Sequence, residues 1–167
     1  MESPSNSQNN WGELTQAVLI SARLSDWPLT LELASPSIRH LHWTGNRPLL
    51  ATTFNLVARA ITPTAAESAA VLQGAARGMT PAAPRPAPPT AAPTSEDSQA
   101  RSPGPASFVT ELRRETTALL RDTLGEQSLQ RLRAEGQAMS TDDAVAYALK
   151  AITHAQRNDS AQPTSIE

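Results

Sequence analysis

The chain has 167 residues, enough for one domain or two very small ones. Its formal net charge is −2, so it lacks the basic excess typical of nucleic-acid-binding proteins, and we expect no nucleic-acid partner. It contains no cysteine, which excludes disulfides, thiol nucleophiles and cysteine-ligated zinc.

The N-terminal run MESPSNSQNN is polar and shows neither the basic start nor the apolar stretch of a secretory signal. No apolar segment approaches the ~20 residues needed to cross a bilayer. We therefore expect a soluble, cytoplasmic protein without a membrane partner.

Composition predicts five segments along the chain. Polar tails are expected at 1–10 and 158–167, a helical-repeat region at 11–78 and a three-helix region at 106–157. Between the two helical regions, 79–105 is rich in Pro and Ala, so neither a helix nor a central strand can propagate through it, and we expect a disordered linker. The prolines of this linker are Pro81, Pro84, Pro86, Pro88, Pro89, Pro93, Pro103 and Pro105.

The first helical region opens with an amphipathic helix. Its inward residues are predicted to be Leu14, Ala17, Val18, Ser21 and Leu24. The run SDWP, from Ser25, predicts a stop followed by a segment that begins with a proline.

The stretch from Leu29 to Trp43 leaves two alternatives open. Its apolar pattern predicts a helix, but Pro36 interrupts that pattern. Ser35 could instead cap a short new helix that runs toward His42.

Two further helices complete this region. Pro48 suits the first turn of one helix, and Thr64 with Glu67 forms a T-x-x-E capping box that opens the other, which ends near Gly74 to Gly78. The apolar faces of the two helices comprise Leu49, Leu50, Thr53, Leu56, Val57, Ala60 and Ile61, and Ala69, Ala70, Val71 and Leu72.

The sequence of the second region, 106–157, predicts three helices with short connections. Gly125 ends the first helix, the second runs from Glu126 to Glu135 and ends at Gly136, and Ser140 with Asp143 caps the third. Such short connections favour antiparallel hairpins, so the expected fold is all-α and tetratricopeptide-like. The inward residues are Phe108, Leu112, Leu119, Leu120, Leu124, Leu129, Leu132, Val145, Ala148, Leu149 and Ile152, with Met139 filling the gap before the last helix.

No combination of residues indicates catalysis or metal binding. His40 and His42 form an H-x-H pair, but zinc needs further ligands and residues i and i+2 of a helix face different ways. Asp142 and Asp143 are adjacent in a first helical turn, where carboxylates usually serve the helix dipole. We accordingly predict no catalytic, cofactor or metal residue, and interpret the widely spaced tryptophans as separate packing anchors. These tryptophans are Trp11, Trp27 and Trp43.

A modest basic cluster spans two helices of the second region. Arginines can bind phosphate or nucleic acid, but interleaved carboxylates cancel most of this field, which favours a solvated, salt-bridged face. The arginines are Arg113, Arg114, Arg121, Arg131 and Arg133, and the carboxylates are Glu111, Glu115, Asp122, Glu126 and Glu135.

The last three helices carry a family resemblance, in the run LRRETTALLRDTLGEQSLQRLRAEGQAMSTDDAVAYAL. It resembles the closing segment of the helical-repeat region in large actinobacterial signalling ATPases, the cyclase-like and LuxR-type regulators. PLLATTFNLVARAI and AAVLQGAARGM are similar to the repeat helices that precede that segment. The matching positions are Gly125, Glu126, Glu135, Gly136, Met139, Ser140, Ala144, Tyr147, Ala148 and Leu149.

The resemblance implies a tetratricopeptide-like module that relays or scaffolds. In full-length relatives it is joined to an ATPase domain, and sometimes to a class III cyclase or a LuxR-type DNA-binding domain. This sequence has no G-x-x-x-x-G-K-[ST] phosphate loop and no terminal basic helix-turn-helix, so it corresponds to the tail alone.

We therefore expect a non-enzymatic protein-interaction module, a detached or truncated C-terminal part of a signalling ATPase or transcriptional regulator. Each helical region is near the size limit for an independent core, so the regions need each other or a partner. The helix from Trp11 to Leu24 offers an apolar face to a partner protein or a second copy. The alternative is a regulatory subunit that acts in trans on an adenylate or guanylate cyclase-like, or LuxR-type, ATPase partner.

Overall fold

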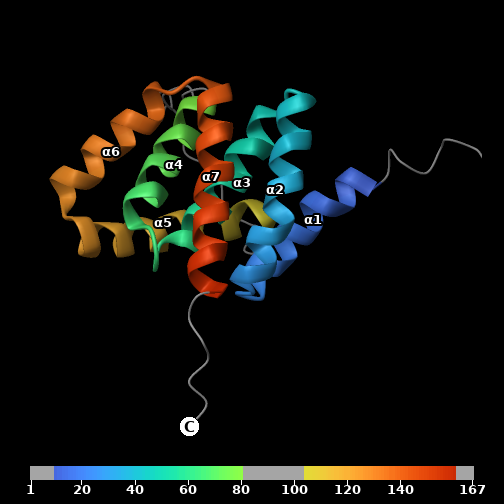
Figure 1. Ribbon diagram of the computed structural model, residues 1–167, viewed down its shortest axis with the longest axis horizontal. Coiled ribbons are helices and arrows are strands. Elements are labelled where there is room, and N and C mark those ends of the chain that lie inside the picture. The colour runs from blue at the N-terminus through green and yellow to red at the C-terminus, as the bar shows by residue number, and fades with distance from the viewer. Residues whose placement is uncertain (1–9, 81–103, 161–167) are drawn as a thin grey trace, which may run out of the picture.

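A computed structural model describes residues 10–80 and 104–160, and in that part of the chain it contains helices and no strand (Figure 1). The predicted all-α class is confirmed for these residues. Residues 1–9, 81–103 and 161–167 of the expected tails and linker lie outside them, whereas Asn10, Met79, Pro105 and residues 158–160 are helical, so the helices extend beyond the predicted boundaries. The helices are α1 (Asn10–Arg23), α2 (Trp27–Trp43), α3 (Arg47–Ile61), α4 (Ala66–Met79), α5 (Pro105–Leu124), α6 (Glu126–Ala138) and α7 (Thr141–Ser160).

The second helix is continuous through its proline. Asp26 caps α2 by accepting a hydrogen bond from the Leu29 amide at 3.2 Å, and the helix then runs to Trp43 with Pro36 inside it. Pro36 removes one backbone hydrogen bond, but Ala34 and Ile38 on either side of it are fully buried. The alternative start at Ser35 is therefore wrong, because burial on both sides of the proline holds one helix together.

The connection between α3 and α4 departs from the predicted capping box. Asn46 caps α3, with Pro48 in its first turn as predicted. At α4, however, the cap position is Ala65, which makes no side-chain bond. The Thr64 hydroxyl instead donates to the Ile61 carbonyl at 3.3 Å, so it completes the end of α3.

In the second region, two of the three predicted helix ends are confirmed. Gly125 separates α5 from α6 with a positive φ of 76°, which glycine adopts at little cost. Ser140 caps α7, since its Oγ accepts from the Asp143 amide at 3.1 Å and donates to the Asp143 carboxylate at 2.7 Å. Gly136 does not end α6, which continues to Ala138.

The helices of the two regions pack around one shared core. Successive helices α1 to α4 lie against each other, whereas α6 packs mainly on α4, and α7 packs on α2, α3 and α4 (Figure 1). The short connections were expected to fold α5, α6 and α7 back onto one another, but α6 makes few contacts with α5 and α7. Large fully buried side chains come from both regions and include Phe54, Ile38, Leu72, Leu120, Leu129 and Ile152.

Most predicted inward residues are buried, with clear exceptions. Leu24 is 75% exposed, because it lies in the turn after α1, and Leu49 and Leu119 are each 40% exposed. The prediction that these residues lie in the core is wrong. For Leu49 and Leu119 the reason is that the apolar face of the helix is wider than the part of it that neighbouring helices cover.

Glycines set the distance between α4 and α6. A Cβ added at Gly74 would overlap the backbone carbonyl of Arg133, and one added at Gly136 would overlap the carbonyl of Val71. The two backbones therefore touch directly, which fixes α6, and Arg133 with it, against α4. This close approach is the real role of Gly136.

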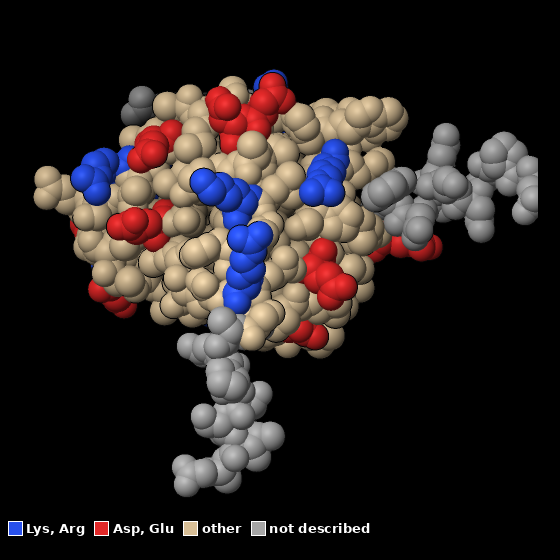
Figure 2. Space-filling view, in the orientation of Figure 1, with Lys and Arg blue, Asp and Glu red and all other residues tan. Residues whose placement is uncertain are grey.

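None of the helices in the described part of the chain combines the length and apolarity that crossing a bilayer requires. On the face that carries α7, basic and acidic side chains are interspersed over a largely uncharged surface (Figure 2).

Candidate anion-binding site

A pocket of about 450 Å³ lies where α3, α4, α5 and α6 meet. Its lining includes five arginines and no carboxylate, in a chain whose net charge is −2. The lining residues are Asn55, Gln73, Arg77, Thr110, Arg113, Arg114, Thr117, Ala118, Arg121 and Arg133.

Helical spacing brings these side chains to the pocket from three directions. In α5, Thr110, Arg113 and Thr117 follow one another at intervals of three and four residues, which places them on one face. In α4, Gln73 and Arg77 are four residues apart and share a face in the same way. Arg133 comes from α6, across the glycine contact with α4.

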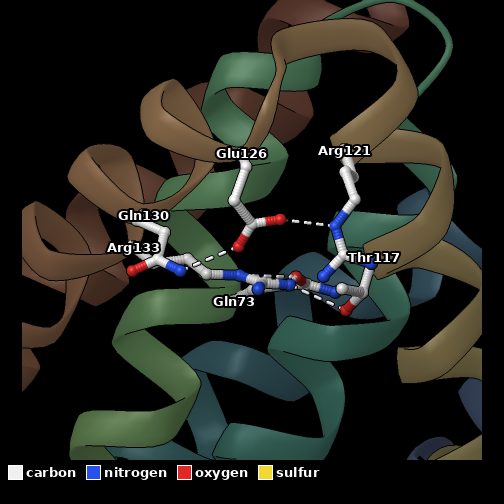
Figure 3. A network of polar contacts seen from close by, with 6 residues as sticks. All are labelled: Gln73, Thr117, Arg121, Glu126, Gln130 and Arg133. Atoms are coloured by element: carbon white, nitrogen blue, oxygen red, sulfur yellow. Dashed lines mark hydrogen bonds and ion pairs between the residues drawn. The ribbon is translucent and has the colours of Figure 1, made fainter.

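Arg133 is held in place by neutral acceptors. Its Nε donates to the Gln73 side-chain oxygen at 3.2 Å, and its Nη2 donates to the same oxygen and to Thr117 Oγ1, the latter at 2.7 Å (Figure 3). Gln73 is buried, and Thr117 donates in turn to the Arg113 carbonyl. The guanidinium is thus oriented without losing its charge to a carboxylate.

Two of the five arginines have carboxylate partners at the edge of the site. Arg121 Nε donates to Glu126 at 2.5 Å, and Arg114 lies 3.9 Å from Glu111. Hydrogen bonds from Gln130 and then Arg121 lower the pKa of Glu126, so this carboxylate stays ionised near neutral pH (Figure 3).

The other three arginines have no carboxylate partner within residues 10–80 and 104–160. Arg77 and Arg113 are exposed and donate to no side chain there, and Arg133 bonds only to Gln73 and Thr117. Burial, and next the charge of Arg77, lower the pKa of Arg133 to about 10, which leaves it protonated at neutral pH. The pocket therefore concentrates positive charge, and ion pairs with carboxylates of the described chain offset it only at Arg114 and Arg121.

The sequence indicated part of this site. Of the predicted basic cluster, the structure brings four arginines to the pocket and leaves Arg131 exposed outside its lining. The expected cancellation by carboxylates is found only at Arg114 and Arg121. Arg77 was missed because it lies in the other helical region, and no local pattern reveals that α4 packs on α6.

The remaining candidates do not assemble into a site. His42 Nε2 lies 2.7 Å from Asp142 Oδ1, while the His40 ring faces Trp43, with 6.4 Å between the ring centroids. Within the described residues, no three side chains of the His, Cys, Asp and Glu types cluster as metal ligands would. Asp143 bonds to Ser140 in the α7 cap through both its backbone amide and its carboxylate.

The tryptophans differ from one another in their surroundings. Trp27 is half-buried beneath the Arg59 guanidinium, 5.0 Å from the ring centroid, and so behaves as the predicted packing anchor. Trp43 is 84% exposed and anchors nothing in the described core, so that prediction is wrong for it. The side chain of Trp11 lies outside the described residues.

Comparison with known proteins gave no match to a family model, to a curated protein or to a solved structure.

Proposed function

We propose that this protein is a non-enzymatic helical interaction module that binds an anionic group of a partner protein in the arginine-lined pocket. The observation that carries the proposal is the set of five arginines with no carboxylate among the lining residues. Clustered like charges destabilise the protein that holds them, and a bound anion relieves that repulsion.

The chemistry of the pocket supports binding rather than catalysis. Guanidinium groups remain protonated and present paired N–H donors that match carboxylate or phosphate oxygens. The lining contains no histidine, aspartate, glutamate or lysine, the usual groups for proton transfer. Pre-oriented Arg133 lowers the ordering cost of capturing an anion.

A second surface fits self-association or a further protein contact. In α1, Val18 and Ala22 are buried, whereas Ile20 is 53% exposed and the adjoining Leu24 is more so. The expected apolar face is therefore open only at its end, at Leu24, where Ile20 adds a second exposed apolar side chain, which suits a partner helix or a second copy.

The family origin remains part of this proposal. The successive packing of α1 to α4 is compatible with tetratricopeptide-like hairpins from a signalling ATPase or regulator, of which this chain would be a detached tail. The alternative, a regulatory subunit acting in trans on a cyclase-like or LuxR-type ATPase, is favoured by the same arginines, since they suit the phosphates of a nucleotide held by the partner.

Fluorescence anisotropy with a labelled hexaglutamate peptide tests the anion-docking proposal. We expect saturable binding at low salt that weakens at least tenfold in an R77Q/R113Q double variant and weakens further with added salt. R131Q removes an arginine of α6 outside the pocket and is the matched control, expected to bind like the unaltered chain. Absence of binding by this and by other anionic peptides, or an equal loss in R131Q, would contradict the proposal.

A further inference from the structure

We propose that the anionic group accepted by the pocket is a phosphoryl group on a serine or threonine side chain of the partner protein. This inference rests on the anion-docking function proposed above and adds the identity of the ligand.

The positive charge of the pocket favours a phosphoryl group over a carboxylate. Three arginines of the lining, Arg77, Arg113 and Arg133, have no carboxylate partner in the described chain. A carboxylate brings a single negative charge, whereas a phosphoryl monoester brings about −1.5 to −2 at neutral pH. The phosphoryl group therefore neutralises more of the charge concentrated in the pocket.

The directions from which the arginine N–H donors reach the pocket also favour a phosphoryl group. The three arginines without a carboxylate partner come from different helices, α4, α5 and α6. A carboxylate offers two oxygens in one plane, while a phosphoryl group offers three in a tetrahedral arrangement. Donors from three helices thus match the phosphoryl oxygens. Arg77 and Arg113 can each bind two oxygens through paired N–H groups, and Arg133, whose Nε and Nη2 bond to Gln73 and Thr117, keeps Nη1 as a donor.

The neutral groups of the pocket favour a peptide over free phosphate. The Asn55 amide nitrogen donates to the Ala51 carbonyl at 2.8 Å, so its Oδ1 is left as an acceptor without a donor among the described residues. Inorganic phosphate offers that oxygen only its P–OH groups, which belong to the same ion that the arginines bind, whereas a phosphopeptide adds backbone N–H donors beside the phosphoryl group.

The size and lining of the pocket agree with this choice. A volume of about 450 Å³ accommodates a phosphorylated side chain together with adjoining backbone. No aromatic side chain lines the pocket, so a nucleobase would find no aromatic ring to stack on there.

Isothermal titration calorimetry, which measures the dissociation constants of three peptides for the full chain, tests the inference. They are Ac-Ala-Ala-X-Ala-Ala-NH2 with phosphoserine, glutamate or serine at X, compared with inorganic phosphate at the same pH and salt. We expect the phosphoserine peptide to bind at least tenfold more tightly than the glutamate peptide and more tightly than inorganic phosphate, and the serine peptide to show no binding.

Variants assign the binding to this pocket. Arg77 and Arg113 are exposed and bonded to no described side chain, so R77Q and R113Q should fold normally and each lower phosphopeptide affinity at least tenfold. R131Q should change it less than twofold. Equal loss in R131Q would overturn the assignment, and circular dichroism of each variant confirms that it is folded.

The outcomes of these titrations distinguish a failure of the phosphoryl inference from a failure of the proposed anion-docking function. If the glutamate peptide binds as tightly as the phosphoserine peptide, the phosphoryl inference fails while anion docking stands. If inorganic phosphate binds as tightly as the phosphopeptide, a peptide-borne phosphoryl group is the wrong source. If neither these peptides nor hexaglutamate binds, both proposals fail.

Discussion

Single side chains decide where several helices begin. Asp26, Asn46 and Ser140 each accept a hydrogen bond from a backbone amide of the first helical turn. Each satisfies a donor that the helix cannot pair internally. Of these caps, Ser140 was predicted by residue, because the acidic residue three positions later completes the motif.

Replacing Ser140 by alanine should lower the free energy of unfolding by about 0.5 to 2 kcal/mol. The Asp143 amide would lose its acceptor, and the side-chain bond between the two residues would be lost as well. Urea denaturation followed by circular dichroism measures the change.

Ser35 provides the matched control for that substitution. It lies inside α2 and caps nothing, so S35A should stay within about 0.5 kcal/mol of the unaltered chain. If S35A were as destabilising as S140A, Ser35 would be acting as a cap, and the continuous α2 helix would be contradicted.

Sequence motifs predicted the wrong helix cap where a polar side chain had two possible hydrogen-bond partners. Thr64 and Glu67 match the capping-box spacing, yet the Thr64 hydroxyl bonds backward to Ile61 at the end of α3. The spacing alone cannot decide between these partners, because both lie within reach of a hydroxyl in a tight turn.

At the scale of elements, periodicity predicted the helices well and their ends less well. The existence of α1, α3, α5 and α7 follows from apolar residues at helical spacing. The sequence pattern predicts a helix end at Gly136, because glycine commonly ends helices, whereas this glycine lies inside α6 and is a contact point between two backbones. A sequence does not distinguish these two uses of glycine until the partner helix is known.

Substituting alanine for Gly136 should destabilise the protein by about 2 kcal/mol or more. The new Cβ would overlap the carbonyl of Val71, so α4 and α6 must separate. The melting temperature should fall, and affinity for anions should fall with it, because Arg133 moves with α6 away from Gln73.

Gly12 is the control for this effect. It lies in α1 with nothing within 4 Å of an added Cβ, so G12A should be neutral or stabilising by up to about 1 kcal/mol. A G136A protein as stable as the unaltered chain would contradict the close contact of α4 with α6.

At the scale of the whole molecule, the sequence predicted the composition of the pocket only within one region. Arg113, Arg114, Arg121 and Arg133 lie close enough in the sequence to suggest a cluster. The pairing of α6 with α4 brings Arg77 and Gln73 to the same place, and this depends on helix packing across the Pro-rich segment. Packing between helices that are far apart in the sequence leaves no local sequence pattern. The sequence alone therefore favours an ordinary solvated face for the basic cluster.

The central claim is that arginines from both halves of the chain form one anion-binding pocket. The most direct measurement is a ¹H–¹⁵N NMR titration of the arginine side-chain Nε–H signals with the phosphoserine peptide. We predict that the signals of Arg77, Arg113 and Arg133 shift together, with one shared dissociation constant, while that of Arg131 stays in place. Shifts limited to Arg113 and its neighbours on α5, with Arg77 unaffected, or equal shifts at Arg131, would contradict a shared pocket.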